Sequence, residues 1–156
     1  MAKRKRKVNT DPLWRFVFIA YIAIMLWLLF GRSQNWAAGL SYRETLRHNI
    51  SLKPFYTIDN YLNVIKNYPE SPYYTQCIIE LLGNTLLFIP AGWLLPRLFR
   101  AMRKFFPFLL TCLLSICFVE SLQLFTLLGH FDVDDIILNI SGMLIGYILY
   151  AITAKK

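Results

Sequence analysis

The sequence predicts an all-α integral membrane protein, a small bundle of four transmembrane helices, and three observations support this. Hydrophobic residues make up 56% of the 156 residues, and the mean hydropathy is +0.44, which is too apolar for an ordinary soluble domain of this size. Four apolar runs approach the roughly 20 residues that a membrane helix needs. The basic residues gather beside these runs, as topology signals do. We expect a single domain over residues 1–156.

The first span is predicted over residues 13–30, a run interrupted only by Arg15, whose long side chain can reach the membrane interface. A basic segment at residues 3–7 precedes it and small residues follow at 35–39, so a cleaved signal peptide is the alternative. The apolar core of a signal peptide has about 7–15 residues, fewer than this run. We therefore favour an uncleaved first helix.

Residues 31–77 are polar and rich in tyrosine and turn-forming residues, which predicts a long extracellular loop between the first two spans. Long loops tend to carry function or disorder. Residues 59–67 predict a short helix capped by Asp59, with Leu62 and Ile65 on one side. The tyrosines suit an element at the membrane interface.

The second and third spans are predicted at residues 78–95 and 106–128. Pro90 should kink the second span, because proline removes one backbone hydrogen bond, and Pro96 should end it. Pro107 suits the first turn of the third span. A basic loop of residues 97–104 connects the two spans.

The fourth span is predicted at residues 135–153, after a tight connection. Asp135, Asn139, Gly142 and Gly146 form one stripe along this helix. The two glycines make a small face on which another helix can pack closely. Asp135 and Asn139 continue the stripe as polar side chains.

Counting lysine and arginine on alternate sides of four spans predicts the orientation. One side holds twelve: the N-terminal segment through Arg15, the 97–104 loop and the tail at 155–156. The other side holds five, all in the 31–77 loop. The positive-inside rule then places both termini in the cytoplasm and the long loop outside.

Polar side chains within apolar spans face protein or a water-filled cavity, because exposing one to hydrocarbon costs a few kcal/mol or more. With the predicted topology, those of the second, third and fourth spans fall at one depth, in the outer leaflet. Arg43, Arg47 and His48 of the loop are available as positive partners. The alternative is a structural polar cluster that orders the bundle. We predict an outer-leaflet ligand-binding cluster of Glu80, Asn84, Glu120, Gln123, His130, Asp132, Asp135 and Asn139.

No metal or cofactor is predicted. Carboxylate and amide oxygens suit Ca²⁺ or Mg²⁺, and converging carboxylates favour a bound cation or perturbed pKa values, but the spacing matches no EF-hand or zinc signature. Cys77, Cys112 and Cys117 are odd in number and lack metal-ligand spacing. The net charge of +8 is concentrated beside the spans and no nucleic-acid-binding module is visible, so nucleic acid is not an expected partner.

Five segments together resemble the VanZ-like membrane proteins over nearly the whole chain. They are LLFGRS (28–33), NISLKPFYTI (49–58), NTLLFIPAGWLLP (84–96), ESLQLF (120–125) and FDVDDIILNISGMLIGY (131–147). The resemblance implies a small multi-helix protein of the Gram-positive cell envelope with a role in resistance to glycopeptides such as teicoplanin. It implies no enzymatic mechanism.

The recurrent polar positions of that family correspond here to residues of the predicted cluster and to Gly142. One departure is His130, which stands where members of the family commonly have an arginine shortly before the FD segment. A fixed cation is thereby replaced by a side chain that titrates near neutrality. The matched positions are Asn84, Glu120, Gln123, Asp132, Asp135, Asn139 and Gly142.

Three functions remain open from the sequence. The first is a non-enzymatic envelope protein that binds a membrane lipid, a lipid-linked precursor or a glycopeptide antibiotic. The second is a membrane enzyme acting on a lipid headgroup, with Glu120 or Asp135 as base and His130 as acid, although no nucleophile motif is present. The third is a transporter or channel, for which four spans without an internal repeat are few, although a homo-oligomeric pore stays open.

Overall fold

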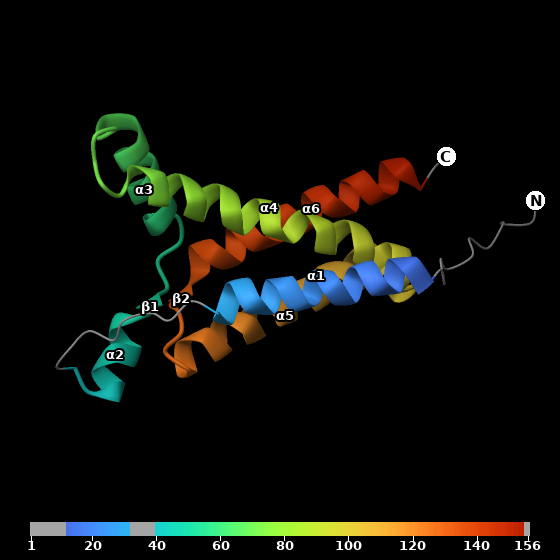
Figure 1. Cartoon of the computed structure of the whole chain (residues 1–156), viewed down its shortest axis with the longest axis horizontal. Helices are drawn as coiled ribbons and strands as arrows, with labels where there is room; N and C mark the ends of the chain where they lie inside the picture. The colour runs from blue at the N-terminus through green and yellow to red at the C-terminus, as the bar shows by residue number, and fades with distance from the viewer. Residues whose placement is uncertain (1–11, 32–39, 155–156) are drawn as a thin grey trace, which may run out of the picture.

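The computed structural model describes residues 12–31 and 40–154, and it is predominantly helical (Figure 1). Within these residues four helices are long and apolar enough to span a membrane, so the predicted fold class is confirmed. The segments at 3–7, 35–39 and 155–156 and Arg32, which entered the signal-peptide and orientation arguments, lie outside the described residues. The four helices are α1 (Pro12–Phe30), α4 (Tyr74–Leu98), α5 (Phe105–Phe125) and α6 (Val133–Thr153).

The ends of α4 and α5 differ from those predicted. Pro96 does not end α4, which continues to Leu98, and the Pro96 carbonyl accepts a hydrogen bond from Arg103 Nε at 3.2 Å. Conversely, α5 stops before residue 128 because Leu127 takes a left-handed conformation (φ 56°). The amides of the next two residues then bond back to the Gln123 carbonyl at 3.0 and 3.2 Å, which closes the helix.

Helices α4 and α6 cross in direct backbone contact (Figure 1). A Cβ atom at Gly142 would overlap the carbonyl oxygen of Thr85, and one at Gly146 would overlap that of Ile89. In the other direction, a Cβ atom on Gly92 of α4 would overlap the carbonyl oxygen of Met143. Three glycines therefore set the distance between the two helices, and Gly92 was not singled out from the sequence.

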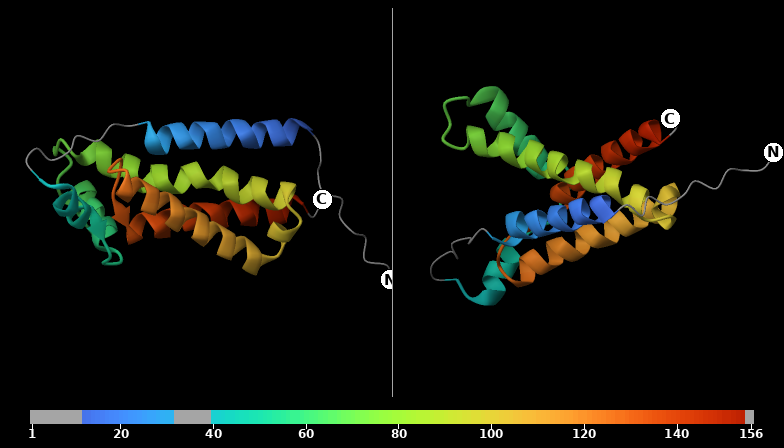
Figure 2. Two further views of the ribbon diagram at one scale, coloured as in Figure 1. Left: turned by 90° about the horizontal axis from the view of Figure 1, so that it is seen from below. Right: turned by 45° about the vertical axis from the view of Figure 1, so that its right-hand side comes forward.

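Helix α1 lies on the opposite side of α4 from α6 (Figure 2). Only Met25 of this helix is buried, in a core that it shares with α4, α5 and α6. Two hydrogen bonds link it to its neighbours: the Tyr21 hydroxyl donates to the Leu87 carbonyl at 2.8 Å, and the Leu29 carbonyl accepts from Gln123 Nε2 at 2.9 Å. Apart from Arg15 near its start, the exposed surface of this helix is apolar, as suits a lipid-facing helix.

At one end of the bundle the start of α1, the end of α6 and the short 3₁₀ helix η1 (Ala101–Arg103) lie together (Figures 1 and 2). Here the Arg97 guanidinium lies over the rings of Trp14 and Trp93, at 4.4 and 4.5 Å. Helices α4 and α5 meet at this end and diverge toward the other (Figure 1). Residues 40–73, the described part of the segment before α4, lie at that other end, as four successive spans require (Figure 1).

That segment contains two helices and a strand: α2 (Tyr42–His48), β1 (Ile50–Ser51) and α3 (Tyr56–Asn67). Helix α2 was not predicted, although Ser41 and Glu44 form a capping box at its start. Strand β1 pairs in parallel with β2 (Phe131–Asp132), directly before α6.

The start of α3 corrects the prediction that Asp59 caps a helix at 59–67. The helix begins at Tyr56, with Asp59 exposed in its first turn. Its cap comes from α6: the fully buried carboxylate of Asp134 accepts hydrogen bonds from the amides of Phe55, Thr57 and Ile58, at 2.5, 2.8 and 3.0 Å. A carboxylate at a helix N-terminus also interacts favourably with the helix dipole.

Asp132 completes this connection. Its Oδ1 accepts from the amide of Asp134 at 2.9 Å and so caps α6, which explains why α6 starts before residue 135. Its Oδ2 accepts from the Thr57 hydroxyl at 2.6 Å. We call these contacts of Asp132 and Asp134 with residues 55–58 the aspartate clasp.

The glycine contact predicts a sharp difference between two alanine substitutions on α4 and α6. Gly142→Ala should lower the free energy of unfolding by about 1–3 kcal/mol, the usual cost of overpacking. Gly83→Ala, where a Cβ meets nothing within 4 Å, should be neutral or stabilising, since alanine favours helix by about 1 kcal/mol over glycine. Thermal unfolding of the purified variants in detergent measures both changes in stability. Equal changes for the two variants would contradict the close crossing of α4 and α6.

The aspartate clasp predicts that Asp134→Asn destabilises the protein. The asparagine loses the charge and turns an amide donor toward backbone N–H groups, and leaving such buried donors unpaired costs about 1–3 kcal/mol. The matched control is Asp59→Asn, which changes an exposed aspartate on the same α3 helix. Thermal unfolding should show a clear loss for Asp134→Asn only, and an unchanged transition would show that the clasp contributes nothing to stability.

Candidate functional site

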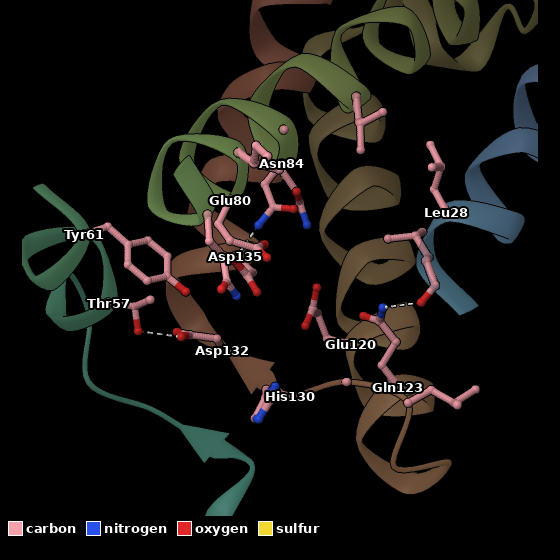
Figure 3. A pocket seen from close by; sticks show the side chains of 18 residues that line it. Leu28, Thr57, Tyr61, Glu80, Asn84, Glu120, Gln123, His130, Asp132 and Asp135 are labelled. Atoms are coloured by element: carbon pink, nitrogen blue, oxygen red, sulfur yellow. Dashed lines mark hydrogen bonds between the residues drawn. The ribbon is translucent and has the colours of Figure 1, made fainter. Parts of the chain in front are cut away.

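A cavity of about 290 Å³ lies at the end of the bundle where α4 and α5 diverge (Figure 3). Every residue of the predicted polar cluster lines it, so the structure brings all of them together. Their role in binding a ligand stays a prediction. These residues are Glu80, Asn84, Glu120, Gln123, His130, Asp132, Asp135 and Asn139.

The rest of the lining includes residues that sequence reasoning missed. Helix α3 contributes Thr57 and Tyr61, and α1 contributes the apolar side chains of Leu28 and Leu29. In Figure 3, Tyr61 and Thr57 lie on one side of the cavity and Leu28 lies on the other. Thr57 precedes the predicted helix of residues 59–67, and Tyr61 was missed because no sequence signal linked that helix to α6.

The cavity is acidic. Its described lining holds one imidazole, His130, and no lysine or arginine, together with four carboxyl groups. The arginines Arg43 and Arg47 and the imidazole of His48, predicted as positive partners, are exposed on α2 and do not line the cavity. The carboxyl groups are those of Glu80, Glu120, Asp132 and Asp135.

Some of the lining side chains hold the helices together. Asn84 Nδ2 donates to Asp135 Oδ1 at 2.5 Å and so links α4 to α6. Gln123 links α5 to α1, and Asp132 belongs to the aspartate clasp. For these residues the structural role considered from the sequence applies.

Two buried oxygens in the lining lack a hydrogen-bond partner among the described residues. They are Oε2 of Glu120, a residue only 4% exposed, and Oδ1 of Asn139, only 3% exposed. In Figure 3 the Glu120 carboxyl group points into the space between α5 and the side chains of Asp132 and Asp135. A buried acceptor without a donor costs about 1–3 kcal/mol, so a hydrogen-bond donor, whether water or a ligand, would be stabilised beside these two atoms.

Tyr61 contributes a neutral hydroxyl group. Burial, and then the negative charges of Glu80 and Asp135, raise the pKa of Tyr61 to about 12. The phenol therefore stays protonated at neutral pH and can donate a hydrogen bond.

The described residues hold no group of three or more His, Cys, Asp or Glu side chains arranged to bind a metal ion. Glu120, Asp135 and His130 do line the same cavity, so the acid and base groups of the enzymatic alternative share one space. His130 is exposed, unlike Glu120.

Comparison with known proteins identifies the family of the chain. A family model described as VanZ/LLP1 matches residues 18–154, which include most of α1, all of α4, α5 and α6, and the cavity between them. Protein VanZ of Enterococcus faecium is 26% identical over 144 residues, which cover 92% of this chain and 76% of that protein. No solved structure matches the chain. The chain belongs to the VanZ-like family of membrane proteins.

Proposed function

We propose that this multi-pass membrane protein binds the headgroup of a lipid, or of a lipid-linked envelope precursor, in the acidic cavity. We further propose that it contributes to resistance against teicoplanin-type glycopeptides through that ligand. The main support is the mixed lining: Leu28, Leu29 and Leu87 are apolar, whereas other lining residues carry carboxyl and amide groups. Such a cavity suits a molecule that is itself part apolar and part polar.

The size of the cavity favours a headgroup over the antibiotic itself. A volume of about 290 Å³ lies at the small end of the roughly 300–1,000 Å³ that is typical of ligand pockets. A glycopeptide antibiotic is several times larger. An effect on glycopeptide sensitivity would therefore come from the envelope component that the cavity binds.

We propose that the cavity opens at the outer leaflet. The opposite end of the bundle carries the cations Arg97, in the last turn of α4, and Arg100, Arg103 and Lys104, between α4 and α5. Cytoplasmic loops are the ones enriched in lysine and arginine. Both termini would then be cytoplasmic, and α2 and α3 would lie outside.

The enzymatic alternative is favoured by one observation, the shared position of Glu120, Asp135 and His130 around the cavity. In that case the ligand is a substrate, and a deletion strain should accumulate it or lose an altered headgroup. Lipid analysis of the deletion strain distinguishes ligand binding from enzymatic modification, because a binding protein leaves the chemical composition of the envelope unchanged.

The proposed function predicts that expression in a susceptible Gram-positive host raises the minimal inhibitory concentration of teicoplanin. Glu120→Gln should return it toward the value of the host, because losing one charge-assisted hydrogen bond weakens binding about tenfold or more. The matched control is Glu70→Gln, an exposed residue outside the cavity, which should protect like the unmodified protein. Equal protection by both variants at equal membrane levels would refute the role of the cavity.

The proposed orientation predicts the labelling of two single cysteines introduced at exposed positions. Asn60→Cys on α3 should react with a membrane-impermeant maleimide in intact cells, whereas Ala101→Cys in η1 should react only after lysis. The unmodified chain, in which Cys77 and Cys112 are buried and Cys117 is half-buried, gives the background. The reverse pattern would place the cavity on the cytoplasmic side.

A further inference from the structure

We propose that the group received by the cavity is a primary ammonium, held between Glu120 Oε2 and Asn139 Oδ1. This rests on the proposed function and names the ligand chemistry of that same cavity. The starting observation is that the two unpartnered buried atoms among its described lining residues are both acceptors. Their complement must therefore be a hydrogen-bond donor.

The charge of the cavity narrows the choice among donors. Four carboxyl groups and one imidazole line it, and lysine and arginine are absent from its described lining. A phosphate or carboxylate placed there would meet like charge, which is costly in a site shielded from water. A single sugar hydroxyl has one O–H donor, so it could bond only one of the two oxygens. A cationic donor both supplies hydrogen bonds and carries a charge opposite to that of ionised carboxyl groups.

Among cationic donors, the geometry favours an ammonium over a metal ion. No group of three or more ligating side chains is present in the described part of the chain. Two of the carboxyl groups are also already engaged, since Asp135 accepts from Asn84 and Asp132 belongs to the aspartate clasp. A primary ammonium has three N–H donors, enough to bond both free oxygens and one further acceptor.

Two outer-surface sources present this chemistry in the same form. One is the headgroup of an aminophospholipid, and the other is a side-chain amine of a lipid-linked peptide precursor. In both, the ammonium is attached to a molecule anchored in the membrane by an apolar chain. The leucines of α1 and α4 in the lining suit the apolar part of either molecule.

The test compares amines with their blocked forms on the full chain in detergent, with binding measured by native mass spectrometry. The lipid arm compares phosphatidylethanolamine, which has a free amine, with its N-acetylated form. Phosphatidylcholine is the third lipid, because its nitrogen stays positive but has no N–H donor. The precursor arm uses a polyprenyl-linked peptide with a free lysine amine and its Nε-acetylated form. The free amine should bind about tenfold more tightly than the blocked form, as expected for one or two charge-assisted hydrogen bonds.

A variant pair assigns the preference to the cavity. Glu120→Gln should abolish the difference between free and blocked amine, and the matched control Glu70→Gln should keep it. Thermal unfolding confirms that both variants are folded, and the comparison of ligands on the unmodified chain needs no variant at all. The arm that shows the preference identifies the source of the ammonium.

The outcomes separate this inference from the proposed function. Equal binding of free and blocked amines would overturn the ammonium while leaving lipid binding in place. A preference that survives in Glu120→Gln would overturn the assignment to this carboxylate. Absence of binding in both arms would overturn the proposed function and the ammonium with it.

Discussion

The aspartate clasp is the interaction on which the candidate site depends. The buried Asp134 carboxylate provides the N-terminal hydrogen bonds of α3, and Asp132 caps α6 while it binds the Thr57 hydroxyl. Two helices from distant parts of the chain are thereby fixed at their N-terminal ends. This link fixes the start of α3 against α6, and it adds to the packing of α3 on α4 that places Tyr61 beside the cavity.

The polar residues of the spans divide into two groups by their hydrogen bonds. Asn84, Gln123 and Asp132 are hydrogen-bonded to neighbouring elements and link the helices around the cavity. Glu120 and Asn139 present oxygens that no described residue satisfies. The close glycine crossing of α4 and α6 makes this arrangement rigid on one side, because the two backbones touch. The same cluster thus contains residues that link the helices and two residues, Glu120 and Asn139, that each have an oxygen without a described partner.

Hydropathy was sufficient to predict the four spans. Because successive spans cross the membrane in opposite directions, the sequence also predicted that their polar residues lie at one depth. Both follow from the bilayer, which imposes helix length and excludes polar groups. The cap of α3 could not be predicted, because Thr57 and Asp134 are 77 residues apart and only the tertiary fold joins them. Helix α2 could have been predicted from its Ser41 and Glu44 capping box. The free oxygens of Glu120 and Asn139 needed atomic positions.

The most direct test of the central claim, that the cavity is a ligand site, is an experimental structure of the full chain purified with its native lipids. The account predicts a bound headgroup in the cavity, with a donor within hydrogen-bond distance of Glu120 Oε2 and Asn139 Oδ1. A cavity that is closed by its own side chains, with both oxygens bonded within the protein, would contradict it.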